Sequence, residues 1–134
     1  MKSPVVVDTN VLSFLFGGLP EARLYERDLV GRRIVVPAQV AGEILFGARS
    51  LPRATEESLA AWLAALGSAP CGEDVVDAWA SIMHDLTSRS PPAPLSVQDT
   101  WVAATAIGLD VPLVAHDAAF RRVRRLRLVC HAPA

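Results

Sequence analysis

Three consecutive valines, Val5 to Val7, constrain the fold of this chain more than any other feature of its sequence. β-Branched residues favour strands, and a run without polar alternation is typical of a strand covered on both faces, as in a parallel sheet. The run ends at Asp8, and Thr9 and Asn10 after it are residues that commonly begin helices. The start of the chain therefore predicts a buried strand followed by a helix, with a carboxylate at their junction.

Short apolar runs and helical patterns continue to alternate along the chain. Further strands are expected at 34–36, at 111–114 and, last, at 126–130. Apolar spacing and capping residues predict helices near 11–16, 20–30, 38–48, 59–66, 76–86 and 101–107. This alternation predicts an α/β fold, with three α/β/α layers around a central, mainly parallel sheet of four to five strands.

Two of these helices carry specific packing predictions. Residues 38–48 are almost all apolar or small, so this helix is expected to be buried. In the later helix an apolar stripe recurs at helical spacing and is expected to face the core; it consists of Val76, Trp79, Met83 and Leu86.

Composition narrows the possible classes of protein. The 134 residues suit one domain, expected over 1–134, and 51% apolar with 20% charged residues excludes intrinsic disorder. A net charge of −1 gives no global basic field, so a polyanion must be held locally. Two cysteines, no signal pattern and no uncharged run of about 20 apolar residues predict a reduced, cytoplasmic protein without a membrane segment.

Four carboxylates stand at unusual positions. Asp8 and Asp117 are each expected to follow directly on a buried strand, where parallel sheets place their ligand crevice. Glu43 is the one charged residue of a helix whose other residues are almost all apolar or small, and it is expected to border the buried face of that helix. Asp99 lies in an S-x-x-D capping pattern and is expected to point inward. Simple capping remains an alternative for Asp8 and Asp99.

Grouping four carboxylates is unfavourable unless a cation compensates their charge. Oxygen ligands without His or Cys favour Mg²⁺ or Mn²⁺, and the histidines and cysteines show no zinc-site spacing. One or two such ions suit hydrolysis of a phosphodiester, because they activate water and stabilise the leaving oxygen. The acids therefore predict metal-dependent phosphodiester hydrolysis.

Four segments carry these acids in order: residues 6–12, 36–48, 99–106 and 113–120. Together, and over nearly the whole chain, they resemble a PIN domain of the VapC toxin type. The resemblance implies a Mg²⁺- or Mn²⁺-dependent endoribonuclease, the toxin of a type II toxin–antitoxin pair. It implies that the catalytic and metal-binding residues are Asp8, Glu43, Asp99 and Asp117, supported by Thr9 and Asn10.

One position departs from that family, in which Thr or Ser often stands two residues before the last acid. Here Ala115 occupies the position and lacks the hydroxyl. The departure favours an alternative function, a catalytically weak or inactive PIN-like module that acts through protein contacts. The four acids favour the nuclease. An aspartyl-nucleophile phosphatase is disfavoured because Asn10 stands where a second acid is required.

Basic residues follow the last acid closely. The candidate RNA contacts are Arg121, Arg122, Arg124 and Arg125. A solvated surface is the alternative for this cluster. His116 adjoins Asp117 and is a further candidate, for proton transfer.

The high apolar content predicts association as well as a core. We expect a homodimer, and a VapB-like antitoxin whose amphipathic helix docks in a groove and reaches the acids with an arginine. The groove is expected to be formed by Phe14, Leu15, Phe16, Leu19, Leu24 and Tyr25. The alternative is that Phe14 and Phe16 belong to the core.

Overall fold

The apolar runs expected as strands form one parallel sheet in the computed structural model, which describes residues 3–134. Residues 1 and 2 of the domain expected over 1–134 lie outside the described residues. The strand order is β3-β2-β1-β4-β5, and every pair is parallel. The strands are β1 (Val5–Val7), β2 (Ile34–Val36), β3 (Gly67–Ser68), β4 (Leu113–Val114) and β5 (Leu128–Val129).

The valine run forms the centre of this sheet, as predicted. Val6 pairs with Val35 of β2 on one side and with Leu113 of β4 on the other, and all three residues of β1 are buried. The chain builds outward from β1 in one direction through β2 and β3, and in the other through β4 and β5. The gap between β1 and β4 is therefore the topological switch point, where open α/β sheets bind their ligands.

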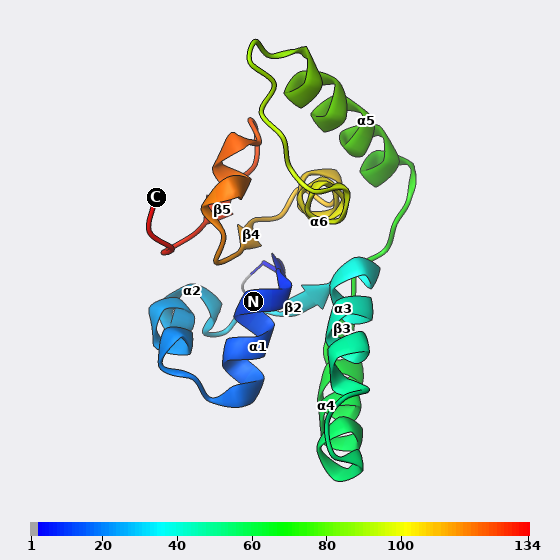
Figure 1. Cartoon of the computed structure of the whole chain (residues 1–134), viewed down its shortest axis with the longest axis vertical. Coiled ribbons are helices and arrows are strands. Elements are labelled where there is room, and N and C mark those ends of the chain that lie inside the picture. Colours follow the sequence, from blue (N-terminus) through cyan, green and yellow to red (C-terminus); the bar gives the residue numbers. More distant parts are fainter. Residues whose placement is uncertain (1–2) are drawn as a thin grey trace.

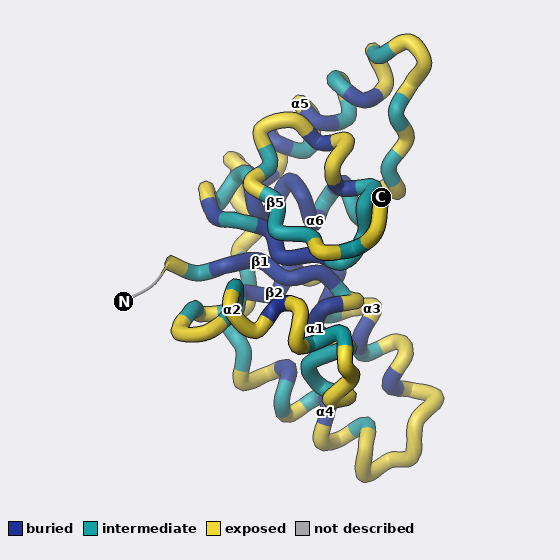
Figure 2. The backbone as a smooth tube through the Cα atoms, turned by 90° about the vertical axis from the view of Figure 1, so that its left-hand side faces the viewer, coloured by how far each residue is buried: buried dark blue, intermediate teal, exposed yellow. Residues whose placement is uncertain are grey.

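Helices cover both faces of the sheet and give the three layers that the sequence predicts (Figures 1 and 2). One layer contains α1 (Thr9–Gly17), η1 (Pro20–Tyr25), α2 (Glu26–Leu29), α3 (Ala38–Ala48) and α4 (Arg53–Ala65). The opposite layer contains α5 (Glu73–Ser88), α6 (Val97–Gly108) and η2 (Ala118–Arg122). Within residues 3–134 none of these helices combines the length and hydrophobicity that crossing a bilayer requires.

Small residues allow α6 to lie close to both the sheet and α5. Ala103, Ala104 and Ala106 are fully buried. At Gly108 an added Cβ would lie 2.7 Å from the backbone of Val75, so only glycine permits this approach of α6 to α5. The close packing holds α6 in place and thereby sets the position of its first turn, which carries Asp99.

Two predictions about helices are wrong, the second only in part. The helix α3 is not wholly buried, because only one of its faces meets the sheet layer, and Phe46 on the other face is 82% exposed. The prediction for α5 is wrong in part: its core face consists of Val75, Ala78, Ile82 and Leu86, so Leu86 is buried as predicted, whereas Val76 is half exposed. The contact between Val75 and Gly108 selects this rotation of α5.

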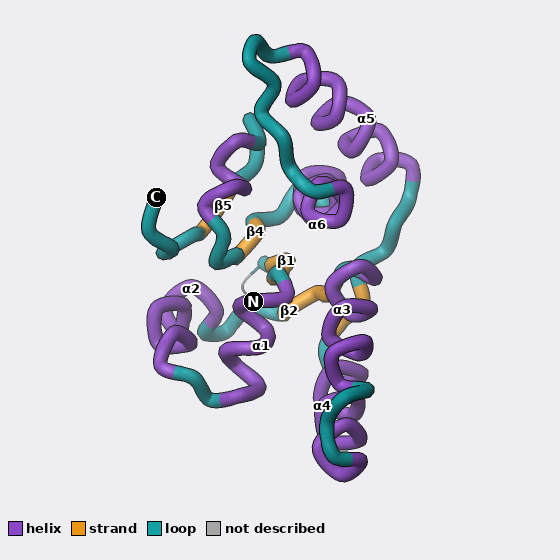
Figure 3. Tube along the Cα trace, in the orientation of Figure 1, coloured by secondary structure: helices purple, strands orange, loops and turns teal. Residues whose placement is uncertain are grey.

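Figure 3 shows how helices, strands and loops follow one another along the chain, and two further elements differ from the sequence prediction. The segment expected as one helix over 20–30 divides into η1 and α2. The two-residue strand β3 pairs with β2 but has no apolar run of its own, since it consists of Gly67 and Ser68. Neighbouring structure, and not local propensity, makes this segment a strand.

Candidate active site

Two of the candidate acids lie beyond the ends of the neighbouring strands β1 and β4. Asp8 follows β1 directly and caps α1: its Oδ1 accepts the N–H of Val11 at 2.9 Å. Its Oδ2 accepts the N–H of His116 at 3.2 Å. Asp117 caps η2, with its Oδ1 accepting the N–H of Ala119 at 2.9 Å. Both side chains therefore cap helices, and both carboxylates lie at the same edge of the sheet.

Asp117 does not follow directly on its strand, contrary to the sequence prediction. The strand β4 ends at Val114, and Ala115 and His116 intervene. Ala115 is fully buried, and its N–H still donates to the carbonyl of Val129. The two residues carry the chain from the buried sheet to its rim, where Asp117 is partly exposed.

The other two acids come from helices on opposite layers. Glu43 lies on α3, and Asp99 lies in the first turn of α6, with its N–H donating to Oγ of Ser96 at 3.0 Å. The two helices are in contact, and the side chain of Gln98 donates to the carbonyl of Gln39 at 3.1 Å. Glu43 is exposed, and it borders the buried face of α3 as predicted, since it stands three residues after the buried Val40 and lines the rim of a cavity.

The four acids line one cavity of about 180 Å³ at the switch point between β1 and β4. Thr9 and Asn10, at the start of α1, line it too. Its lining consists of Asp8, Thr9, Asn10, Glu43, Asp99, Val102 and Asp117. The structure thus brings together all six residues that the sequence singled out for this site, from four separate elements.

The buried position of Asp8 changes its acidity. Burial raises the pKa of Asp8 from its ordinary value of 3.8 to about 6, although the N–H groups of Val11 and His116 lower it, and the charges of Asp99 and Asp117 raise it further. Burial also raises the pKa of Asp99, against the hydrogen bond of Ser96, and the charge of Asp117 adds to the increase. The cavity therefore concentrates negative charge that a cation would stabilise.

The side chains around the cavity suit a hard divalent cation, since they offer carboxylate, hydroxyl and amide oxygens but no nitrogen or sulfur ligand. Within residues 3–134, no three Asp, Glu, His or Cys side chains lie close enough to enclose an ion by themselves. An ion here would take part of its shell from water or from a phosphate, which is the usual situation of Mg²⁺ in proteins. The donor set therefore fits the predicted ion.

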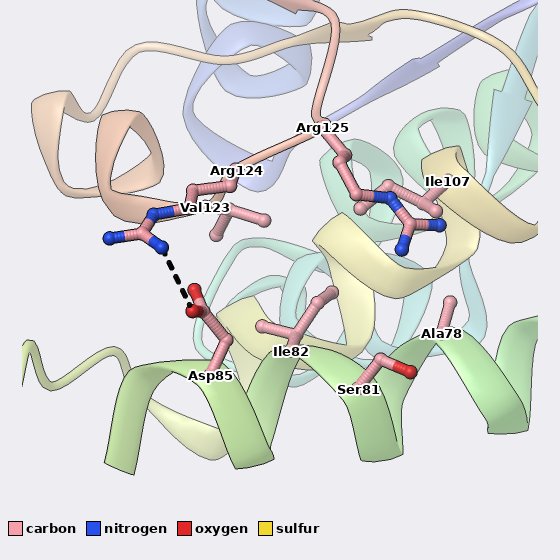
Figure 4. Close-up of a pocket in the computed structure, with 8 residues that line it drawn as sticks. All are labelled: Ala78, Ser81, Ile82, Asp85, Ile107, Val123, Arg124 and Arg125. Atoms are coloured by element: carbon pink, nitrogen blue, oxygen red, sulfur yellow. Dashed lines mark ion pairs between the residues drawn. The ribbon is translucent and has the colours of Figure 1, made fainter. Parts of the chain in front are cut away.

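The arginines predicted to contact RNA do not line this cavity. Arg121 donates to the carbonyls of Cys130 and Ala132 at 3.2 and 3.1 Å, and Arg122 donates to the carbonyl of Pro94. Figure 4 shows Arg124 and Arg125 beside a second cavity, between α5, α6 and the segment after η2. There Arg124 lies 3.5 Å from a carboxylate oxygen of Asp85.

Two aromatic residues have a different place from the one predicted. Tyr25, expected to line an exposed groove, is fully buried, and its hydroxyl oxygen lies 2.6 Å from Nδ1 of His116. His116 does not line the acidic cavity, so the geometry lends no support to its predicted role in proton transfer. No local pattern in the sequence could reveal this contact. The only available signal is that a buried tyrosine hydroxyl needs a polar partner.

The chain is therefore a three-layer α/β/α protein with an acidic cavity at the carboxyl edge of its parallel sheet, at the switch point between β1 and β4. The model of the PIN domain family matches residues 5–126, and the chain belongs to this family. PIN domains are generally nucleases that depend on divalent metal ions. A search of curated proteins finds no match to the sequence.

Solved structures confirm the fold. VapBC2 from Rickettsia felis, bound to a DNA fragment from its promoter, has a TM-score of 0.80 at 17% identity, covering 96% of this chain and 98% of that one. DNA-bound VapBC from Salmonella typhimurium has a TM-score of 0.80 at 16% sequence identity, covering 96% of this chain and 98% of that one. VapBC-5 from Mycobacterium tuberculosis, a member of the VapBC family of toxin–antitoxin systems, has a TM-score of 0.71 at 20% sequence identity, covering 98% of each chain. The chain therefore shares the fold of these proteins.

Proposed function

We propose that this protein is a Mg²⁺- or Mn²⁺-dependent endoribonuclease of the VapC toxin type, and that it acts in the cytoplasm. The observation that carries the proposal is the convergence of Asp8, Glu43, Asp99 and Asp117 on one cavity at the switch point of the sheet. Stability of the fold does not require these four acids to meet, since each could cap its own helix or face solvent at a separate place.

Each residue has a distinct part in this proposal. Asp8 is the most firmly held acid, because both of its oxygens accept backbone N–H groups. The charges of Asp99 and Asp117 act on it from α6 and from the start of η2, and Glu43 faces the open rim. Thr9 and Asn10 provide further oxygen atoms at the start of α1.

These residues would hold one or two Mg²⁺ or Mn²⁺ ions, which supply charge neutralisation and Lewis acidity for hydrolysis of a phosphodiester when bound. The protein contributes the spacing and orientation of the carboxylates. The partly exposed Asp117 and the exposed Glu43 leave one side of the cavity open, so that an RNA backbone can approach.

The proposed partner is a VapB-like antitoxin, because the similar solved structures include the two VapBC complexes with DNA described above. On this chain the candidate docking surface is the exposed part of the predicted groove, Leu19 and Leu24, which are 43% and 48% exposed. Phe14, Leu15 and Phe16, which were predicted for the same groove, are half-buried. Phe16 packs against Trp62 at 5.5 Å, so it belongs in part to the core.

An RNA cleavage assay tests the enzymatic proposal. Purified protein should cleave a fluorescent single-stranded RNA with Mg²⁺ or Mn²⁺ and not with EDTA, and Asp8→Asn should abolish cleavage. Asp77→Asn is the matched control, because Asp77 is an exposed acid of α5 that does not line the cavity. Full activity of Asp8→Asn would exclude the mechanism. If the protein binds an antitoxin but does not cleave RNA, the alternative function, an inactive interaction module, is supported.

A further inference from the structure

The hydroxyl of Tyr25 joins three parts of the chain that are distant in sequence. Tyr25 ends η1 and is fully buried. Its hydroxyl oxygen lies 2.6 Å from Nδ1 of His116, 3.2 Å from the carbonyl oxygen of Ala115 and 2.9 Å from the backbone nitrogen of His131. It therefore links η1 to the segment after β4 and to the segment after β5.

The chemistry of a hydroxyl determines the direction of these three hydrogen bonds. A phenol has one hydrogen to donate and two lone pairs to accept. The carbonyl of Ala115 can only accept, so it takes the phenolic hydrogen, and the N–H of His131 donates to one lone pair. His116 can then bond to the hydroxyl only as a donor, which assigns a hydrogen to its Nδ1. Burial raises the pKa of Tyr25, so the phenol keeps the hydrogen that this arrangement needs.

The segment that Tyr25 holds is the one that supports the acidic cavity. The N–H of His116 donates to Oδ2 of Asp8, and its carbonyl accepts from the side chain of Asn10 at 3.4 Å. The next residue along the chain is Asp117. Three of the residues that line the cavity are thus attached, directly or through one peptide bond, to a residue that Tyr25 anchors.

Ring contacts hold His116 from two further sides. Its imidazole lies edge-on to Tyr25, with ring centroids 5.7 Å apart, and edge-on to Phe14 at 5.2 Å. Its side chain is thereby kept out of the cavity while its peptide group faces Asp8 and Asn10. The hydrogen bond from Nδ1 prevents the ring from turning between these two aromatic neighbours.

We propose that Tyr25 is a positioning residue of the acidic site, which acts through His116 to fix the relative places of Asp8 and Asp117. This inference rests on the proposed function, since it concerns the same cavity. The hydroxyl, not the ring, carries the role. A phenylalanine would fill the same core space but would leave Ala115, His116 and His131 without their shared partner, and the segment 115–117 would lose its anchor.

The expected consequence is a weaker hold on the divalent cation. Loss of a group that orients metal-binding side chains from behind typically costs about 10- to 100-fold in metal affinity or activity. Because Tyr25 is buried and does not line the cavity, its loss should lower kcat and raise the Mg²⁺ concentration for half-maximal activity, while KM for RNA changes less than about twofold.

The first test compares Tyr25→Phe with Thr105→Val. The control also removes one buried hydroxyl, that of Thr105, which donates to the carbonyl of Trp101 at 2.8 Å within α6 and does not line the cavity. Both variants are assayed at a temperature where circular dichroism shows them fully folded, and Mn²⁺ binding is also measured by calorimetry without RNA. Tyr25→Phe should bind Mn²⁺ at least tenfold more weakly, and Thr105→Val should bind it like the wild type.

The second test separates the two imidazole nitrogens and does not depend on Tyr25→Phe folding. The side-chain amide of Asn reaches the place of Nδ1, whereas that of Gln reaches the place of Nε2. His116→Asn should therefore be at least tenfold more active than His116→Gln. Equal activity, or a more active Gln variant, would mean that the bond to Tyr25 does not matter and would overturn the proposal.

These outcomes distinguish the inference from the proposed function. If the wild type cleaves RNA, Asp8→Asn is inactive, and Tyr25→Phe matches the wild type in Mn²⁺ affinity and kcat, the nuclease stands and the positioning role is wrong. If the wild type neither binds Mn²⁺ nor cleaves RNA, the proposed function itself is wrong, and the positioning role is overturned with it.

Discussion

The backbone N–H of His116 donates a hydrogen bond to the carboxylate of Asp8 over 3.2 Å, although 108 residues separate them in sequence. The contact follows from the parallel pairing of β1 and β4, in which Val7 lies opposite Val114. Because both strands end at the same edge, the residues just after them must meet. One polar contact therefore joins the two halves of the sheet at the place where the candidate acids gather.

The raised pKa of Asp8 predicts how stability depends on pH without metal. The pKa is about 6 in the fold, above its ordinary value of 3.8, so the folded state binds the proton more tightly than the unfolded state. This contribution is complete below pH 3.8 and is lost as the pH rises through 6. The loss amounts to about 3 kcal/mol.

Urea unfolding in EDTA between pH 4 and pH 7.5 measures this effect as the difference between the wild type and Asp8→Asn. The asparagine variant should gain stability relative to the wild type as the pH rises, because it has no charge to bury. Asn offers one oxygen where Asp8 accepts two N–H groups, which lowers the stability of the variant by an amount that does not depend on pH. A difference that stays constant with pH would contradict the assignment.

Divalent ions should stabilise the folded protein by mass action, because the unfolded chain has no such cluster. Mg²⁺ or Mn²⁺ at 10 mM should raise the Tm of the wild type, and neither Zn²⁺ nor Ca²⁺ should replace them in the cleavage assay. The increase in Tm should be lost in Asp99→Asn and kept in Asp77→Asn. An unchanged melting curve of the wild type, with no heat of binding by calorimetry, would exclude the metal site.

The basic cluster in and just after η2, Arg121, Arg122, Arg124 and Arg125, leads to a separate prediction about RNA affinity. Arg127 lies 3.1 Å from a carboxylate oxygen of Asp110, whereas Arg125 has no ion-pair partner within the described residues. If this cluster contacts phosphates, Arg125→Gln should weaken RNA binding and lower the slope of log Kd against log salt by about 1. Arg127→Gln is the control. Filter binding at several salt concentrations measures the affinity and the slope for each variant, in the Asp8→Asn background to prevent cleavage. An unchanged slope for Arg125→Gln would mean that the cluster is only a solvated surface.

Exposed apolar side chains lead to a prediction about association. Phe46, at 82% exposure, lies on the outer face of α3, and large apolar patches on a protein surface commonly mark interfaces. We expect a homodimer by light scattering at tens of micromolar, and a shift toward monomer in Phe46→Ser. A monomeric wild type at this concentration would contradict the prediction.

A docking prediction concerns the antitoxin. Leu24→Asp places a charge on the exposed rim of the predicted groove, at a side chain that is 48% exposed, and circular dichroism checks that the variant is folded. It should weaken binding of a VapB-like helix at least tenfold in a pull-down or calorimetric titration. Leu51→Asp, at another exposed leucine of 43% exposure, serves as control. Equal affinity of both variants would exclude this groove.

The sequence by itself determined the elements whose signal is local. The valine run predicted the central strand because buried parallel strands need β-branched residues throughout, and Asp8 and the S-x-x-D pattern beginning at Ser96 marked the starts of two helices through side-chain capping. The acids were found for a related reason: a carboxylate is conspicuous where its neighbours are apolar.

Only the tertiary structure decided which faces and partners those elements have. The rotation of α5 depends on how closely Gly108 approaches Val75, and β3 exists because β2 offers it an edge. The role of Tyr25 depends on partners 90 and 106 residues away. Periodicity and capping report interactions within a few residues, whereas hydrogen bonds between distant segments depend on how the strands align, and that alignment is a property of the whole sheet.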